Sequence, residues 1–438
     1  MLTISDAPGA HDVSRGEKAI VIGVELQGKG NGRSADAKLD EAVGLARAIG
    51  VEVVAARTFR LRAPRPSTLL GKGQTEEIAD IAKRNEAGLL IVDAALTPVQ
   101  QKSLEEEAGA KVIDRTSLIL EIFGERAATA EGRLQVELAH LDYQAGRLVR
   151  SWTHLERQRG GFGFLGGPGE TQIEADRRLI RDRMARIRRE LEQVKRTRSL
   201  HRDRRQRAPW PVIALVGYTN AGKSTLFNRM TGEGVLAENM LFATLDPTMR
   251  EVRLPGFDKA ILSDTVGFVS DLPTQLVAAF RATLEEVSSA DILVHVRDMA
   301  HPDRDAQKED VESVLAQLGA GREDEGSPPL IEGWNKVDLL PEEERNALIA
   351  EAERRDLTVP LSALTGWNVD RLREIVAERL RHGAQLHRVR IPAGDGSRIA
   401  WLHARGDVVG QRTDAEEVQI DVRLSAENWA RFQALQPA

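Results

Sequence analysis

The chain has 438 residues, of which 41% are hydrophobic and 29% are charged, values typical of a soluble globular protein with about three domains. It contains no cysteine, which excludes disulfides, thiol catalysis and thiolate metal sites, and its nine scattered histidines show no zinc-binding spacing. No apolar run reaches the length of a membrane span, we expect no signal peptide, and the net charge of −6 conceals a strongly basic stretch at residues 175–208.

Residues 1–18 are polar and aperiodic, and we interpret them as a disordered lead. From residue 19 to residue 128, apolar runs of strand length alternate with amphipathic stretches of helical length. This alternation predicts βαβ units, and therefore a small parallel sheet that helices cover on both faces. Within this N-terminal domain, the loop Leu70-Gly71-Lys72-Gly73 fits either a contact with phosphate or RNA or an ordinary helix start.

Residues 129–208 contain two long amphipathic segments. Their apolar residues recur at alternating spacings of three and four, which is the pattern of a coiled-coil seam. The seam residues are Leu134, Leu138, Leu141, Ala145, Leu148, Trp152 and Leu155 in the first segment, and Ile180, Met184, Ile187, Leu191 and Val194 in the second. The glycine-rich stretch 159–172 between them cannot continue a helix, so we predict an antiparallel helical hairpin with an adaptable tip.

The second arm of this hairpin is rich in arginine. Residues 175–208 carry 14 Lys/Arg against 5 Asp/Glu, and 13 of the 14 are arginine. Such a run can be a solvated helix face. However, arginine pairs bidentately with phosphate and stacks on bases, and Phe162 and Phe164 in the tip can stack on unpaired bases. We therefore predict that the arm and the tip contact RNA.

A third domain, residues 209–383, opens with an apolar run, a G-x-x-x-x-G-K-[ST] motif and a helical pattern. A strand that enters a glycine-rich turn and opens a helix directs backbone N–H groups and the helix dipole at one point, which suits a phosphate chain. We expect Lys223 to contact the β- and γ-phosphates and Ser224 to coordinate Mg²⁺. The predicted phosphate-binding residues are Gly217, Tyr218, Thr219, Asn220, Ala221, Gly222, Lys223 and Ser224.

Two further motifs are predicted to reach the γ-phosphate. One is D-x-x-G, formed by Asp264, Thr265, Val266 and Gly267, in which Asp264 would hold Mg²⁺ through water and the Gly267 N–H would meet the phosphate. The other is the stretch Phe242, Ala243, Thr244, Leu245 and Asp246. We choose Thr244 to complete the Mg²⁺ shell, with Thr248 as the rival. The predicted catalytic residues are thus Lys223, Thr244 and Gly267, and the metal ligands are Ser224 and Thr244.

The N-K-x-D motif, formed by Asn335, Lys336, Val337 and Asp338, selects the base. The Asp338 carboxylate can accept from the N1–H and 2-amino groups of guanine, whereas adenine would leave it unpaired at a cost of roughly 1 to 3 kcal/mol or more. Asn335 suits the N7/O6 side of guanine and buttresses the loop, and the stem of Lys336 lies over the ring. A backbone N–H among Ser362, Ala363 and Leu364 would meet guanine O6.

Residues 384–438 alternate between short strand and helix patterns and predict a compact α+β domain whose sequence indicates no chemistry. The predicted fold class is therefore α/β and multidomain. It comprises an N-terminal parallel α/β domain (19–128), an antiparallel helical hairpin or coiled coil (129–208), a P-loop GTPase domain with a mainly parallel sheet (209–383) and a small C-terminal α+β domain (384–438).

The motifs G-Y-T-N-A-G-K-S, F-A-T-L-D-P-T, D-T-V-G-F, N-K-V-D and S-A-L resemble those of the HflX family, within the TRAFAC class of GTPases. So do G-P-G-E-T-Q-I-E at 167–174, residues 131–139 and Asp114-Arg115-Thr116. The resemblance implies a protein that hydrolyses GTP with Mg²⁺, binds the large ribosomal subunit and its RNA, and splits stalled ribosomes under stress. We further expect a cytoplasmic monomer, partly associated with ribosomes or membranes. Gly166 stands where many members carry an arginine.

Phe268 follows Gly267, where Ras-like proteins carry a glutamine that orients water. Because phenylalanine cannot hydrogen-bond water, we predict slow intrinsic hydrolysis that a partner accelerates. Two alternatives from other functional classes remain. One is a nucleotide-dependent RNA remodeller that uses ATP at the N-terminal domain, and the other is a signalling switch with protein partners only, whose binding to RNA would be weak and insensitive to salt.

Overall fold

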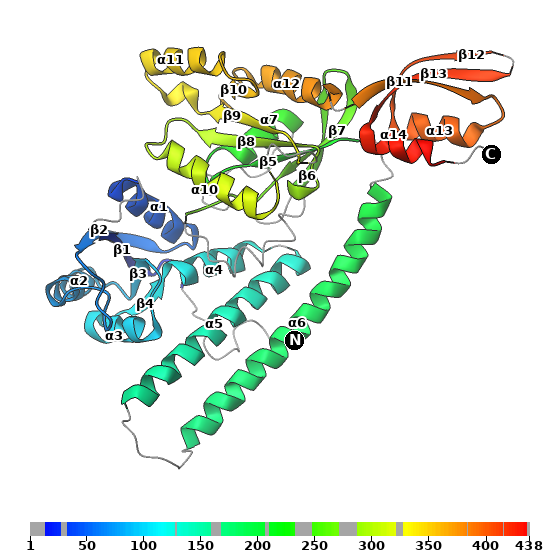
Figure 1. Ribbon diagram of the computed structural model, residues 1–438. Helices are drawn as coiled ribbons and strands as arrows, with labels where there is room; N and C mark the ends of the chain where they lie inside the picture. Colours follow the sequence, from blue (N-terminus) through cyan, green and yellow to red (C-terminus); the bar gives the residue numbers. More distant parts are fainter. Residues whose placement is uncertain are drawn as a thin grey trace.

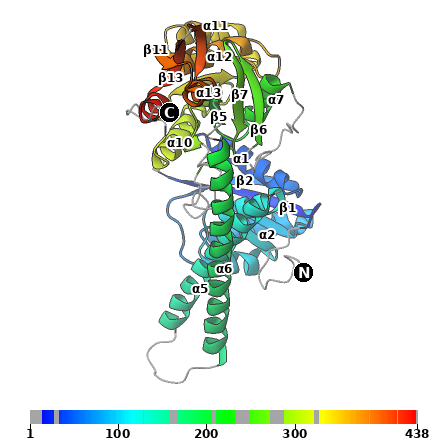
Figure 2. The same ribbon diagram turned by 90° about the vertical axis from the view of Figure 1, so that its right-hand side faces the viewer.

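The computed structural model describes residues 14–27, 33–127, 129–158, 168–205, 210–232, 248–270, 287–320, 327–382, 384–414 and 416–435. Within these residues, three β-sheets and one long helical hairpin are arranged as in Figure 1, with the hairpin extending away from the sheets. The view from the right-hand side, Figure 2, shows the two hairpin helices side by side. Among the described helices, none is both long and apolar enough to cross a membrane.

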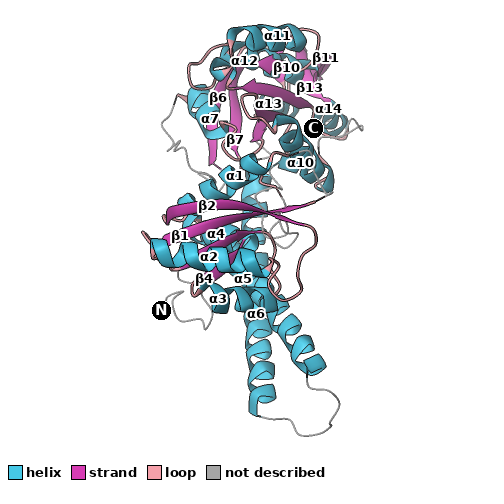
Figure 3. Ribbon diagram, turned by 90° about the vertical axis from the view of Figure 1, so that its left-hand side faces the viewer, coloured by secondary structure: helices cyan, strands magenta, loops and turns pink. Residues whose placement is uncertain are grey.

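The N-terminal sheet is parallel, has the strand order β2-β1-β3-β4, and carries helices on both faces. Its elements are β1 (Lys18–Leu26), α1 (Ala35–Ala48), β2 (Glu52–Leu61), α2 (Lys72–Asn85), β3 (Leu89–Asp93), α3 (Pro98–Ala108), β4 (Lys111–Asp114) and α4 (Arg115–Arg126). Side chains alternate along each strand, so one face packs on α1 and α4 and the other on α2 and α3. Figure 3 shows this sheet below the second sheet. The predicted parallel α/β layout is confirmed.

Two details of this domain differ from the sequence prediction. Residues 14–18, which we assigned to the disordered lead, are ordered, since the Gly16 N–H donates to the Gly50 carbonyl at 2.8 Å and Lys18 begins β1. We therefore propose that the domain begins at residue 14. Helix α4 was not predicted, although Asp114 caps it by accepting from the Ser117 N–H at 2.8 Å.

The glycine-rich loop at the start of α2 is an ordinary helix start. Gly71 is the N-cap residue, and its N–H donates to Gln74 Oε1 at 2.8 Å. The Lys72 side chain is 83% exposed and forms an ion pair with Glu76 one helical turn away. These contacts satisfy the local geometry of the helix end and favour the simpler of the two interpretations of this loop.

The hairpin consists of α5 (Ala130–Gln158) and α6 (Pro168–Arg205), and its seam follows the predicted pattern on α6. Met184, Ile187 and Leu191 are all under 9% exposed, and neighbouring positions on α6 are exposed. Across the hairpin, Arg183 donates to the two carboxylate oxygens of Glu137 at 2.7 and 3.0 Å. The antiparallel hairpin and the α6 half of its seam are therefore confirmed for the described residues, whereas the predicted α5 seam residues Leu134, Leu138, Leu141 and Ala145 are only half-buried.

The start of α6 corrects the predicted tip. We expected 159–172 to be non-helical, yet residues 168–172 already belong to α6. Pro168 is the first helical residue, where proline loses no hydrogen bond and its fixed φ suits a helix, so it begins the helix instead of breaking it. The rest of the tip, including Phe162, Phe164 and Gly166, lies outside the described residues.

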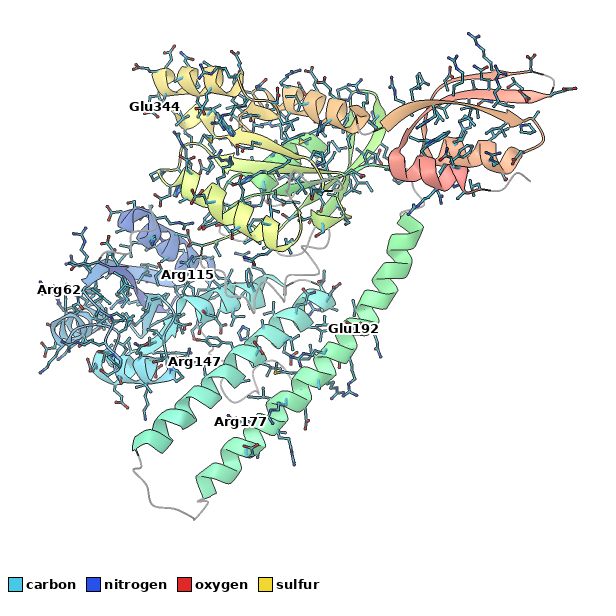
Figure 4. All side chains as sticks on the ribbon, in the orientation of Figure 1. Arg62, Arg115, Arg147, Arg177, Glu192 and Glu344 are labelled. Carbon is cyan, nitrogen blue, oxygen red and sulfur yellow. The ribbon has the colours of Figure 1, made fainter. Side chains whose placement is uncertain are left out.

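Helix α5 also anchors the hairpin to the N-terminal domain. Its Tyr143 hydroxyl donates to Asp114 Oδ1 at 2.9 Å, and Arg147 forms an ion pair with the same carboxylate at 3.4 Å. Burial raises the pKa of Tyr143 above its ordinary value, and the Asp114 charge adds to this effect. Figure 4 labels Arg147 between α5 and the N-terminal domain. The hairpin is thus fixed at its base.

The second sheet has six strands in the order β10-β9-β8-β5-β7-β6, parallel except for β6. Its elements are β5 (Val212–Val216), α7 (Lys223–Thr231), β6 (Thr248–Leu254), β7 (Phe257–Asp264), β8 (Ile292–Asp298), α10 (Arg304–Gln317), β9 (Leu330–Asn335), α11 (Glu342–Ala352), β10 (Thr358–Pro360) and α12 (Val369–His382). Central strand β5 is buried between β7 and β8. The mainly parallel sheet is confirmed.

The C-terminal sheet is antiparallel, with the order β11-β13-β12. Its elements are β11 (Ala384–Pro392), α13 (Gly396–Arg405), β12 (Asp407–Thr413), β13 (Glu417–Ser425) and α14 (Ala426–Gln433). Side chains alternate along β13, because Val418, Ile420, Val422 and Leu424 are all buried in one cluster with residues of α13 and α14.

Candidate nucleotide-binding site

Two glycines let the loop after β5 approach its neighbours closely. Gly217 has φ of +149°, and a Cβ there would lie 2.3 Å from the Val296 carbonyl oxygen. Gly222 has φ of +96°, and a Cβ there would lie 2.2 Å from Asn335 Nδ2. No L side chain fits either position. The loop is therefore pressed between β8 and the end of β9, at the carboxyl edge of the sheet.

Lys223 begins α7, and its side chain reaches back into this loop. Its side chain is buried, and Nζ donates to the carbonyls of Gly217 and Tyr218 at 3.0 and 2.8 Å. Burial lowers the pKa of Lys223 to about 8, and the charge of Asp264 only partly offsets this effect. The two carbonyls of the loop therefore hold the ammonium group in place.

A hydroxyl oxygen and a carboxylate oxygen meet directly beside Lys223. The Ser224 hydroxyl donates to Asp264 Oδ2 at 2.7 Å, and Asp264 is buried at the end of β7. The next residue, Thr265, anchors the strand end by donating from its hydroxyl to the Leu215 carbonyl at 2.6 Å. A hydroxyl and a carboxylate at this spacing are the hard oxygen ligands that suit Mg²⁺.

Backbone hydrogen bonds join the loop after β7 to residues 217–224, the phosphate loop. The Thr219 N–H donates to the Phe268 carbonyl at 2.7 Å, and the Phe268 N–H donates to the Gly217 carbonyl at 3.1 Å. A Cβ on Gly267 would lie 2.8 Å from Thr219 Cα and 3.0 Å from Lys223 Nζ, so this position also requires glycine. The Phe268 side chain is buried in the core.

Asn335 joins the phosphate loop to residues 362–364. Its Nδ2 donates to the Ala221 carbonyl at 2.8 Å, and its Oδ1 accepts from the Ala363 N–H at 2.9 Å. Lys336 has φ of +65° and forms an ion pair with Asp298 at 2.7 Å. Asp338 lies in the short 3₁₀ helix Val337–Leu339 that follows β9. The motifs are thus adjacent at one sheet edge.

The structure also adds a polar junction with the N-terminal domain that the sequence did not reveal. The Tyr218 hydroxyl donates to Glu41 at 2.6 Å and accepts from the Ser270 N–H at 2.7 Å. Arg115 donates to the Ser270 hydroxyl at 2.8 Å and forms ion pairs with Glu41 and Asp93. Burial raises the pKa of Tyr218 to about 12, and the charge of Glu41 adds to the shift. Figure 4 labels Arg115 at this boundary.

No sequence pattern identifies this junction, because its members come from α1, β3, α4 and two loops of the second sheet. The pair Asp298 and Lys336 is an addition that a pattern could have found, since Asp298 ends β8 and Lys336 directly follows the neighbouring parallel strand β9. The stretch 242–246, including Thr244, lies outside the described residues. Thr248 begins β6 and pairs with Asp264.

The chain matches four family models that follow one another along its length. They are described as a GTP-binding GTPase N-terminal region over residues 36–124, a GTP-binding GTPase middle region over 126–205, a 50S ribosome-binding GTPase over 212–336 and an HflX C-terminal domain over 347–434.

Curated relatives match most of the chain. GTPase HflX of Magnetococcus marinus is 49% identical over 395 residues, which cover 90% of this chain and 90% of that protein. GTPase HflX of Escherichia coli is 42% identical over 401 residues, covering 91% and 92%. A solved GTP-binding protein from Sulfolobus solfataricus in complex with GDP is 23% identical, with a TM-score of 0.44 and coverage of 83% of this chain and 98% of that one. The sequence identities over nine-tenths of its length show that this chain belongs to the HflX family of GTPases.

Proposed function

We propose that this GTPase binds Mg²⁺ and GTP at the carboxyl edge of its six-stranded sheet, and that GTP lets the basic hairpin engage the RNA of the large ribosomal subunit. We further propose that this engagement dissociates stalled ribosomes under stress. The observation that carries the nucleotide site is the pair of hydrogen bonds made by Asn335. It bonds Ala221 of the phosphate loop and Ala363 of residues 362–366, the base-side loop. A ligand with phosphates and a purine at opposite ends suits that arrangement.

In the proposed complex, Lys223 exchanges its two carbonyl partners for the β- and γ-phosphate oxygens. The Gly267 N–H meets the γ-phosphate, because the backbone there lies against the phosphate loop. Ser224 and, through water, Asp264 would hold Mg²⁺, with Thr244 completing the shell. The ion supplies charge neutralisation at the transferring phosphoryl group.

The buried Phe268 supports slow intrinsic hydrolysis. Its side chain is 3% exposed and its backbone is bonded on both sides, so nothing at this position can orient the attacking water. We propose that the ribosome supplies this ordering. GTP turnover should therefore rise when large subunits are added, and a fast rate that large subunits leave unchanged would contradict the proposal.

The proposed partner surface lies on α6. Arg178, Arg181, Arg186, Arg188 and Arg189 are exposed along the described part of the helix. Guanidinium groups can pair with phosphates and stack on bases, which suits ribosomal RNA better than a protein partner. The 50S ribosome-binding description of the matched family model agrees with this assignment.

Exchange of the base-reading carboxylate tests the nucleotide site. Asp338→Asn replaces an acceptor by an amide that can donate, so GDP should bind at least about 10-fold more weakly and xanthosine diphosphate more tightly. Titration of the full chain with both nucleotides measures this. Unchanged preference for GDP would contradict the proposed role of Asp338.

A further inference from the structure

Arg229 belongs to none of the nucleotide-binding motifs, yet its side chain contacts the base-side loop. It lies on α7, the helix that opens at Lys223. Its Nε donates to the Ala363 carbonyl at 3.3 Å, and its Nη2 donates to the Leu364 carbonyl. A Cβ on Gly366 would lie 3.5 Å from Arg229 Cζ, so the guanidinium rests against that glycine. One surface side chain therefore holds two successive carbonyls of the loop.

Side-chain packing does little to hold this loop in place at its outer end. The Leu364 side chain is 69% exposed, so burial cannot fix its position. Within the loop, the Gly366 N–H donates to the Ser362 carbonyl at 2.8 Å and closes a tight turn. Asn335 holds the Ala363 N–H from the side of β9. Arg229 is the contact that holds the Ala363 and Leu364 carbonyls from the side of α7.

Holding a carbonyl also orients the neighbouring N–H. The Ala363 carbonyl and the Leu364 N–H belong to one planar trans peptide and point in opposite directions. Because Arg229 holds that carbonyl toward α7, it turns the Leu364 N–H away from α7. A cationic donor on the carbonyl also polarises the amide and strengthens its N–H as a donor.

We infer that Arg229 is a positioning residue for guanine recognition, which aims the backbone N–H of the 363–364 peptide at the base oxygen O6. This inference rests on the proposed function, in which Asp338 reads the N1–H and 2-amino edge of the same base. The two contacts address different atoms of guanine. Analogues altered at one edge therefore separate Arg229 from Asp338.

The test compares Arg229→Met with wild type in binding GDP, 6-thio-GDP and IDP. The 6-thio analogue replaces O6 by a poorer acceptor, and IDP lacks the 2-amino group. Loss of one hydrogen bond predicts that GDP binds about 3- to 10-fold more weakly, with little change for 6-thio-GDP. The preference for GDP over IDP should remain that of wild type. Arg229→Lys, which keeps one donor, should restore part of the lost affinity.

Arg373→Met is the matched control. Arg373 donates from α12 to the Met230 carbonyl at 2.8 Å and to the Arg229 carbonyl at 3.5 Å, so it links α12 to the backbone of the same helix, and among the described contacts it bonds none of residues 362–364. Arg373→Met should keep the wild-type ratio of GDP affinity to 6-thio-GDP affinity and the wild-type ratio of GDP affinity to IDP affinity. The inference is overturned if Arg229→Met keeps the wild-type preference for GDP over 6-thio-GDP, or if it lowers the affinities for all three nucleotides equally.

Asp338→Asn distinguishes failure of this inference from failure of the proposed function. If Asp338→Asn loses the preference for GDP over IDP while Arg229→Met changes nothing, only the role of Arg229 is wrong. If Asp338→Asn also retains that preference, the proposed base site itself is wrong.

Discussion

At the scale of single residues, Lys223 connects the fold to the chemistry most directly. Burial lowers its pKa to about 8, yet it must carry a proton to bind phosphate. In the free protein its ammonium group donates to neutral carbonyls at 2.8 and 3.0 Å, and the charge of Asp264 only partly offsets the effect of burial. Phosphate oxygens would replace these by a full opposite charge, which raises the pKa.

We therefore predict proton uptake on nucleotide binding. At about pH 9 Lys223 is mostly unprotonated in the free protein, so GDP binding should be accompanied by uptake of about one proton. At about pH 7 Lys223 is already protonated, so the uptake should be small. The sign follows from a pKa that is lower in the free state than in the bound state, so affinity should fall as pH rises above about 8.

Calorimetry of GDP binding in buffers with different ionisation enthalpies measures this proton count. The same heat in all buffers at about pH 9 would show that Lys223 does not titrate as described. Because Lys223→Met has no titratable group at this position, any binding that it retains should show less proton uptake than wild type.

At the scale of elements, the Tyr218 hydroxyl and the hairpin seam are among the contacts that join the N-terminal domain, the hairpin and the six-stranded sheet. The Tyr218 hydroxyl links the phosphate loop to Glu41 of α1 and to Ser270 after β7. The seam of the hairpin holds α6 against α5. Each contact can be tested by removing a few atoms.

Tyr218→Phe removes the hydroxyl and leaves the Ser270 N–H and the Glu41 carboxylate each short of one partner. Because these groups are part-buried or buried, we expect a loss of about 1 to 3 kcal/mol in unfolding free energy and faster hydrogen exchange at the Ser270 amide. Tyr143→Phe, which removes a hydroxyl at the base of the hairpin, should leave exchange at Ser270 unchanged. Equal exchange in wild type and Tyr218→Phe would contradict the role of this hydroxyl.

Ile187→Ala tests the hairpin seam. Ile187 is fully buried between the arms, so its truncation should cost about 2 to 5 kcal/mol in urea unfolding. The neighbouring exposed residue provides the control, because Arg188→Ala should change stability by less than about 0.5 kcal/mol. If the two variants unfold alike, α6 does not pack as described.

These elements also show what the sequence could predict. The phosphate loop, D-x-x-G and the α6 seam were predictable because their spacing is fixed by local backbone geometry and helix period. Helix α4 was missed, although its Asp114 cap and the apolar run beyond it were readable signals. The Tyr218 junction and the bonds from Arg229 to residues 363 and 364 could not be predicted. Each joins residues far apart in the chain through contacts that only the folded arrangement creates.

At the scale of the whole molecule, the proposed nucleotide site lies where the second sheet meets the N-terminal domain. The junction of Tyr218, Glu41, Arg115 and Ser270 spans that boundary. Helix α6 extends from the tip of the hairpin back toward the second and third sheets, as Figure 1 shows. We propose that a change at the γ-phosphate is transmitted across this boundary to the helices of the hairpin.

The central claim is that a guanine nucleotide governs whether the basic hairpin engages the large ribosomal subunit. Co-sedimentation of the full chain with isolated large subunits measures this directly, with a non-hydrolysable GTP analogue, GDP or no nucleotide present. We predict strong co-sedimentation with the GTP analogue, weak co-sedimentation with GDP, and loss of the difference in Asp338→Asn. Equal co-sedimentation of the wild-type chain under all three conditions would contradict the account.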